Sequence, residues 1–274
     1  MHTKTTLAAA AEIRKLAIMA MESAGYGHIG GSMSICDVLA VLYEDILNVD
    51  PGDSKMRGRD WVVLSKGHCA PALCAALAYK GYFDKEELKT LNANGTKLPS
   101  HCDRLKTNGV DISTGSLGQG ISLATGVALG NKMQGIDSTV YVILGDGELN
   151  EGQNWEAFQF IAHRQMDNLV VIIDQNLRQL DGYTEEICKP FNLKDKLTAF
   201  GLRTLEADGH DVCAIYEALT QKPAALILHT EKGHGCNFAE IQGFNHYMVI
   251  TPEMAASACA EIDKRLEKSY ELLG

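Results

Sequence analysis

The amino-acid sequence predicts an α/β fold with a doubly wound, mainly parallel sheet and helices on both faces. Three observations predict it: short apolar runs alternate with helical stretches, these runs are apolar at nearly every position, and the composition is globular. The chain has 274 residues, 46% hydrophobic and 22% charged, which excludes collagen-like and disordered classes. A chain of this length buries about three quarters of its unfolded surface, so it needs no disulfides or structural zinc. We expect one domain over residues 1–274.

The predicted strands are short, rich in β-branched residues and bounded by turn residues. Because their apolar residues are continuous rather than alternating, both faces of the sheet should be covered by helices, as in a parallel sheet. The four strands are expected at residues 61–64, 139–144, 169–174 and 224–229.

The helical stretches precede and separate these strands. They are expected at about residues 6–23, 34–47, 70–80, 117–133, 152–163 and 212–221. A last helix should start with Thr251 at the N-cap and Pro252 at the first helical position, and should be a surface helix or a docking helix. The segment 232–250, rich in Gly, His and Asn, is predicted to be a mobile loop. We find no linker or internal repeat that would divide the chain.

Charge and cysteine use exclude several classes of partner. The net charge of -10 argues against a nucleic-acid surface, which needs clustered Lys and Arg. The apolar run near the N-terminus is interrupted by Glu12 and Arg14, and no run approaches the roughly 18 to 20 residues of a membrane span. The eight cysteines are scattered without CxxC, which indicates reduced, mostly buried thiols. We expect a cytoplasmic protein without nucleic-acid or membrane partners.

Polar residues follow two neighbouring strands of the predicted sheet. Gly145, Asp146 and Gly147 come after strand 139–144, and Asn176 comes after the next strand. The carboxyl ends of parallel strands meet at one edge of a sheet, so these residues should converge. Carboxylate and amide oxygens suit Mg²⁺, and glycines let the backbone approach phosphates. A GDG alone is more often a plain turn, but with this Asn it predicts a magnesium and diphosphate site.

Seven motifs, in the same order, carry a resemblance to a known family. The chain resembles the N-terminal, diphosphate-binding half of transketolase, and its length is similar to that of the small subunit of split-gene transketolases. The motifs are GHIGGSMS (27–34), LSKGH (64–68), LPSH (98–101), STGSLGQG (113–120), GDGELNEG (145–152), DQN with LDG (174–182) and DGHD (208–211).

The resemblance implies the thiamine-diphosphate-binding fold, with thiamine diphosphate and Mg²⁺ as cofactors and Ca²⁺ or Mn²⁺ as possible substitutes for the metal. The implied metal ligands are the side chains of Asp146 and Asn176 and the backbone carbonyl of Arg178. The backbone of Gly147 would approach the diphosphate. The two positions that would touch the aminopyrimidine region are Gly115 and Leu117.

The same resemblance assigns catalytic roles. The residues that would surround the thiazolium and the sugar are His28, His68 and His101, and His68 would also contact the cofactor. Glu151 matches a glutamate in a proton-sharing network between subunits. A later family histidine matches either His234 or His246, and the sequence leaves this open.

Other residues in these motifs carry further expectations. Ser100 and Cys102 replace the family's Gly and Pro beside the third histidine, which should change the shape of the substrate channel. Cys69 also follows a histidine, so both thiols are candidates to line the site. Of the remaining histidines, His210 is expected to organise a turn, and the surface is expected to hold His2 and His163.

The predicted helix 117–133 contains four glycines, Gly118, Gly120, Gly126 and Gly130, each about 1 kcal/mol worse than Ala in a helix interior. Close packing across a subunit contact, a cofactor against the first turn, or tight packing within the chain would each offset this cost. The sequence leaves these three explanations open.

The resemblance implies transfer of a two-carbon ketol unit from a ketose, phosphorylated or otherwise anionic, to an aldose. The family's catalytic glutamate lies in a pyrimidine-binding domain that this sequence lacks. We therefore expect a partner, a C-terminal subunit with the pyrimidine-binding and C-terminal domains, in a heterotetramer. Two alternatives are an alpha-type subunit of a 2-oxoacid-decarboxylating enzyme and a non-catalytic assembly subunit. The three histidines and STGSLGQG favour ketol transfer, and the identity of the sugars stays open.

Overall fold

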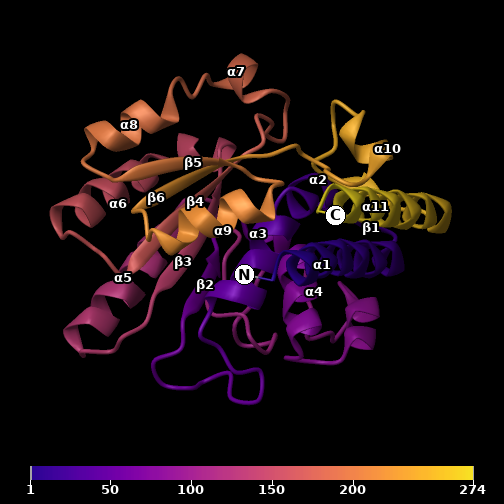
Figure 1. Ribbon diagram of the computed structural model, residues 1–274, viewed down its shortest axis with the longest axis horizontal. Coiled ribbons are helices and arrows are strands. Elements are labelled where there is room, and N and C mark those ends of the chain that lie inside the picture. Colours follow the sequence, from indigo (N-terminus) through magenta and orange to yellow (C-terminus); the bar gives the residue numbers. More distant parts are fainter. Residues whose placement is uncertain (1, 274) are drawn as a thin grey trace.

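A sheet of five parallel strands forms the centre of the protein, in the order β2-β3-β4-β6-β5 (Figure 1). The computed structural model describes residues 2–273. The strands are β2 (Trp61–Leu64), β3 (Val140–Gly145), β4 (Leu169–Gln175), β5 (Thr204–Asp208) and β6 (Ala225–His229). The predicted α/β fold with a parallel sheet is confirmed.

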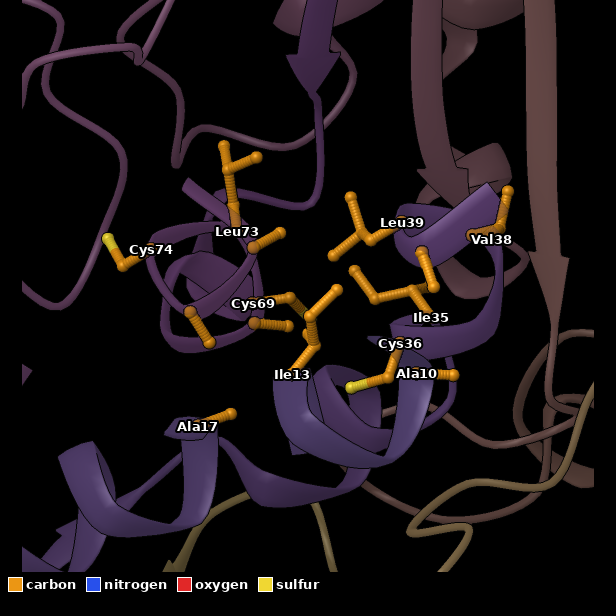
Figure 2. Packing of buried hydrophobic residues seen from close by; sticks show 14 of the residues in the cluster. Ala10, Ile13, Ala17, Ile35, Cys36, Val38, Leu39, Cys69, Leu73 and Cys74 are labelled. Atoms are coloured by element: carbon orange, nitrogen blue, oxygen red, sulfur yellow. The ribbon is translucent and has the colours of Figure 1, made fainter. Parts of the chain in front are cut away.

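Helices cover both faces of this sheet and form two hydrophobic clusters. One cluster holds residues of α1 (Thr3–Ala24), α3 (Cys36–Val41), α4 (Ala70–Lys80) and α9 (Val212–Thr220). The other holds residues of α5 (Gln119–Met133), α6 (Gly152–His163) and α8 (Leu193–Ala199). Successive strand residues alternate between the two clusters, which explains why each central strand is apolar throughout. Figure 2 shows Ile13 of α1 beside Leu39 of α3 and Leu73 of α4.

The predicted helices are found except at one place. The stretch 34–47 is not one regular α-helix. It contains α3 and then a π-helical turn, η1 (Leu42–Ile46), and it follows directly on the short helix α2 (Ile29–Met33). The short elements are η2 (Gly67–Cys69), η3 (Lys85–Thr90), η4 (Gly147–Asn150), α7 (Thr184–Ile187) and α10 (Asn237–Glu240). The last helix, α11 (Pro252–Leu273), starts as predicted, since Thr251 Oγ1 accepts a hydrogen bond from the backbone N–H of Met254 at 3.3 Å.

The strands that the sequence did not predict lie at edges. β5 is an edge strand in which only Thr204 is buried and the following residues alternate between partly buried and exposed, so it lacks a continuous apolar run. A second sheet pairs β1 (Tyr26–Gly27) with β7 (Met248–Val249) in antiparallel fashion. β7 and α10 both lie in the segment 232–250, which therefore carries more structure than the predicted loop. Two backbone hydrogen bonds join this segment to Gly30, from Gly30 N to Asn245 O and from Gly233 N to Gly30 O.

The cysteines and the helix lengths agree with the sequence analysis. All eight cysteines are free thiols and most are buried. Within residues 2–273, no helix combines the length and the apolar character that crossing a membrane requires.

Candidate functional site

A cavity of about 290 Å³ lies at the carboxyl ends of β2, β3 and β4. The structure brings nearly all the predicted site residues to it. Those that line it are His28, His68, His101, Gly115, Leu117, Asp146, Gly147, Asn176 and Arg178. Glu151 does not line it: this residue is exposed at the N-cap of α6. Cys69 and Cys102 are buried and do not line it either, so that expectation is wrong.

The predicted metal ligands lie in two facing turns after β3 and β4. Asp146 is buried, and its carboxylate accepts hydrogen bonds from Gly147 N at 2.8 Å and Leu177 N at 2.7 Å. Burial, and the nearby charge of Asp174, raise the pKa of Asp146 to about 7. A cation bound here would relieve the cost of this buried charge. The donor set, one carboxylate, one amide oxygen and one carbonyl, is the hard-oxygen type that Mg²⁺ prefers.

Backbone conformation ties these ligands into one turn. Leu177 adopts a left-handed conformation with φ of 62°, which is unfavourable for a residue with a side chain. This turn places Leu177 N–H on the Asp146 carboxylate, while Arg178 N–H donates to Asn176 Oδ1 at 3.1 Å. One hydrogen bond therefore joins Asp146 to this turn, and the other joins Asn176 to Arg178 within it.

A buried ion pair that the sequence analysis did not identify lies beside the metal ligands. Lys66 Nζ donates to Asp174 Oδ2 at 2.6 Å and to Gly31 O at 2.8 Å. Asn176 Nδ2 donates to the same Asp174 oxygen at 2.6 Å, which directs the amide oxygen of Asn176 away from Asp174. Burial opposes both charges, but the attraction between them dominates, so the pKa of Lys66 is raised and that of Asp174 is lowered. The sequence did offer one signal for this ion pair, because Lys66 lies in the motif LSKGH and Asp174 in the motif DQN.

Four histidines gather at the open side of the cavity, and one of them answers the question that the sequence left open. His246 lines the cavity, with its ring centroid 4.7 Å from that of His68 and 5.3 Å from that of His28. His101 lies 5.5 Å from His28, and Ser100 Oγ lies 3.2 Å from His101 Nδ1.

These imidazoles are neutral near neutral pH. Burial, with His101 and Lys232 nearby, lowers the pKa of His28 to about 4. Burial, with Lys232 and His28 nearby, lowers the pKa of His246 to about 3. Burial also lowers the pKa of His68 and His101. A neutral imidazole has one donor and one acceptor nitrogen, so the four rings can bind hydroxyl groups and accept protons.

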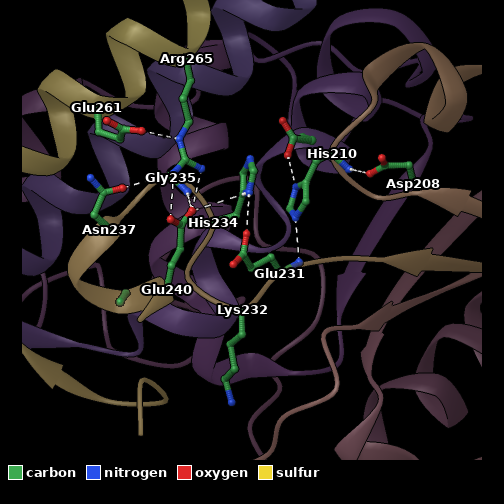
Figure 3. Close-up of polar contacts among 12 residues, drawn as sticks. Asp208, His210, Glu231, Lys232, His234, Gly235, Asn237, Glu240, Glu261 and Arg265 are labelled. Carbon is green, nitrogen blue, oxygen red and sulfur yellow. Dashed lines mark hydrogen bonds and ion pairs between the residues drawn. The ribbon is translucent and has the colours of Figure 1, made fainter. Parts of the chain in front are cut away.

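His234, the other candidate, lies outside the cavity in a polar cluster beside α11 (Figure 3). Its Nδ1 is 3.6 Å from Glu231 Oε2 and 3.9 Å from Glu240 Oε1. Its ring stacks on His210 at 3.6 Å. Both ring nitrogens of His210 have partners, because Nδ1 lies 2.8 Å from Asp37 Oδ2 and Nε2 accepts from Glu231 N. His210 thus holds neighbouring segments together, as predicted.

Lys232 is a further cavity residue that the sequence analysis did not identify. Its side chain points away from the cluster of Figure 3, and its Nζ donates to Arg178 O at 3.2 Å and lies 3.3 Å from His246 Nδ1. Burial foremost, together with Lys66, lowers the pKa of Lys232 to about 8. Lys232 and Lys66 both line the cavity and place positive charge near the predicted diphosphate position.

The four glycines of the α5 region divide into two pairs. A Cβ at Gly118 would meet Glu151 and Gln153, and one at Gly120 would meet Ser65, so close packing within the chain requires both. A Cβ at Gly126 or Gly130 would meet nothing within 4 Å. Packing among the described residues therefore explains the first pair and leaves the second pair unexplained.

The neutral state of His28 predicts a pH dependence of stability. Its folded-state pKa of about 4 lies below the ordinary value of 6.5, so the unfolded chain binds the proton more readily. The resulting stability is fully present above pH 6.5 and is lost as the pH falls towards 4. Between these values, the wild type should lose more free energy of unfolding than His28→Asn, as measured by urea denaturation. The control is His163→Asn, outside the cavity; equal losses in wild type and His28→Asn would contradict the prediction.

Comparison with known proteins extends the similarity over the whole cavity. The family model "Transketolase, thiamine diphosphate binding domain" matches residues 5–246. A 6-deoxy-6-sulfo-D-fructose transketolase subunit of Clostridium sp. (strain MSTE9) is 48% identical over 92% of this chain and 94% of its own length. One of the apulose-4-phosphate transketolase subunits, from Phocaeicola vulgatus, is 38% identical over 93% of this chain and 92% of its own. The solved structure of transketolase from Campylobacter jejuni matches with a TM-score of 0.89 and 29% identity, over 96% of this chain but 43% of that chain.

Proposed function

Because the chain belongs to the transketolase family and contains its thiamine diphosphate binding domain, we propose that it is the N-terminal subunit of a split transketolase. It would take part in moving a two-carbon ketol unit from a ketose to an aldose. The observation that carries this proposal is the cavity, where the predicted metal ligands and four neutral histidines lie together at the carboxyl ends of the strands.

The cavity fits the cofactor that the family implies. Asp146, Asn176 and the Arg178 carbonyl would hold Mg²⁺, or Ca²⁺ or Mn²⁺ in its place. A Cβ at Gly147 would meet the side chain of Gln179, so packing within the chain requires a glycine there, and its bare backbone would face the diphosphate. Lys66 and Lys232 would balance the diphosphate charge. Thiamine diphosphate, when bound, supplies a nucleophilic carbon and an electron sink for breaking a C–C bond.

The histidines would position the sugar and move its protons. His28 and His68 can each donate one hydrogen bond to a hydroxyl and accept another. In His101 and His246, Nδ1 lies near Ser100 Oγ and Lys232 Nζ, which leaves Nε2 for a hydroxyl. Their lowered pKa values keep a free nitrogen available to receive a proton from a hydroxyl at neutral pH.

The partner would be a C-terminal subunit that carries the pyrimidine-binding and C-terminal domains, in a heterotetramer. Two relatives of nearly the same length are named as subunits, and this chain covers 43% of a transketolase that is one chain. The exposed side of α5 supports this proposal: among residues 2–273, nothing lies within 4 Å of a Cβ placed at Gly126 or Gly130, and Leu123 and Met133 are 46% and 78% exposed. Glu151 is also exposed, and we place it in a proton-sharing network with the partner.

The substrate would be a ketose with a phosphate, a sulfonate or another anionic group at its far end. One relative is named for a sulfonated sugar and another for a phosphorylated one, which supports an anionic substrate. The group that binds this anion would belong to the partner. We further propose that residues 1–274 act as one domain in the cytoplasm.

The test is an assay of ketol transfer with the chain alone, the partner alone and the two mixed. We expect transfer only in the mixture, because the partner supplies half of the cofactor site. Pyruvate decarboxylation is measured beside it and should stay at background. Comparable transfer by the chain alone would contradict the need for a partner, and decarboxylation as the main activity would contradict ketol transfer.

A further inference from the structure

Glu148 is a buried carboxylate that lines the cavity without a role in the metal site or among the histidines. It lies in η4, directly after the GDG turn, and is 3% exposed. Its Oε1 accepts hydrogen bonds from Gly118 N at 2.8 Å and from Ser65 Oγ. Its Oε2 accepts from Gly145 N at 3.1 Å. Three donors from three separate elements therefore converge on one side chain.

These donors connect the two ends of the cavity. Gly145 ends β3 and begins the turn that holds Asp146, the predicted metal and diphosphate end. Gly118 is the N-cap of α5 and follows Gly115 and Leu117, which line the other end. Gly118 has φ of 82° and, as a glycine, no side chain that could cap the helix, so Glu148 supplies an acceptor from outside.

We propose that Glu148 is a positioning residue that sets the distance between the diphosphate end of the cofactor cavity and the aminopyrimidine end, beside Gly115 and Leu117. The assignment rests on the proposed function, because it concerns how this chain would hold thiamine diphosphate. The carboxylate holds the loop before α5 against the turn after β3. The hydroxyl of Ser65, directly after β2, donates a third hydrogen bond to the carboxylate.

A carboxylate suits this place because it only accepts hydrogen bonds. Both of its oxygens face backbone N–H groups or a hydroxyl that can donate. In Glu148→Gln one of the two positions becomes an NH₂ group, which would face a donor and leave a backbone N–H without a partner. The NH₂ group fits the Oε1 position, because Ser65 Oγ there can accept a hydrogen bond, whereas Oε2 faces only the N–H of Gly145. The N–H of Gly118 then loses its partner and the loop before α5 must shift, while the turn with the metal ligands remains.

The test compares a probe that occupies one end of the cavity with a probe that spans it. Calorimetry on the full chain measures binding of Mg²⁺ with inorganic pyrophosphate, and of Mg²⁺ with thiamine diphosphate. Glu148→Gln should weaken thiamine diphosphate about tenfold and leave pyrophosphate nearly unchanged. The matched control is Asn168→Ala, which removes a 2.8 Å hydrogen bond to Ala128 O of α5, outside the cavity lining, and should show no such split.

A second variant keeps the test valid if Glu148→Gln does not fold. Ser65→Ala removes one donor but leaves the carboxylate, and should give the same split at a smaller size, about threefold. Equal weakening of both probes, or no weakening of either, would overturn the positioning role in whichever variant folds. A wild-type chain that bound neither probe, alone or mixed with the partner subunit, would instead overturn the proposed function on which the assignment depends.

Discussion

Asp146→Ala is expected to weaken Mg²⁺-dependent binding of thiamine diphosphate by about 100-fold or more. Removing a residue that only hydrogen-bonds to a metal ligand already costs roughly 10- to 100-fold in metal affinity, and Asp146 would be a ligand itself. The fold should survive. Burial raises the pKa of Asp146 to about 7, so losing this charge removes a cost that offsets the two lost backbone hydrogen bonds. Asp146→Asn, which keeps one acceptor oxygen, should show the same loss of affinity with a smaller change in stability.

Two measurements check this prediction. Calorimetry gives the affinity with and without Mg²⁺, and urea denaturation gives the free energy of unfolding. The control is Asp167→Ala, which removes an exposed carboxylate that pairs with Lys132 outside the cavity. Affinity retained in Asp146→Ala would reject Asp146 as a metal ligand.

Asp174→Asn is expected to lower the free energy of unfolding by about 3–5 kcal/mol, because it leaves the ammonium of Lys66 buried without a counter-charge. Both side chains are almost inaccessible to water, at 2% for Lys66 and 0% for Asp174. Adding Lys66→Met to Asp174→Asn removes the unpaired charge, so the double variant should regain part of the loss.

Urea denaturation of the two single variants and the double variant measures this coupling. Asp263→Asn is the matched control, because it breaks an ion pair with Lys15 that is partly exposed and should cost at most about 1 kcal/mol. If Asp174→Asn cost no more than this control, or if the double variant were no more stable than Asp174→Asn, the buried pair would not contribute as described.

The fold was predictable where apolar patterning reflects burial on both sides. The central strands β3 and β4 are apolar throughout and were predicted nearly to their ends. β5 was not, because only one of its faces packs against a hydrophobic cluster, through Leu205 and Ala207, and the sequence there alternates. The predicted helix 34–47 failed because regular apolar spacing does not distinguish an α-helix from one that continues as a π-helical turn.

The site was predictable where ligands directly follow parallel strands. The paired ends of β3 and β4 bring Asp146 and Asn176 together, and this does not depend on the conformation of the loops beyond them. Residues whose role depends on a distant partner were not. Lys66 and Glu148 are buried only because Asp174, Gly118 and other distant groups satisfy them, and no local pattern records that pairing. His246 could not be separated from His234 because segment 232–250 has no regular period that would fix its direction.

A crystal structure of the chain grown with thiamine diphosphate and Mn²⁺ would test the central claim most directly. Anomalous scattering locates the manganese without reference to the protein. We predict one ion bound by Asp146, Asn176 and the carbonyl of Arg178, with the diphosphate against Gly147. A diphosphate bound elsewhere, or an ion absent from these three oxygens while the cofactor is present, would contradict the account.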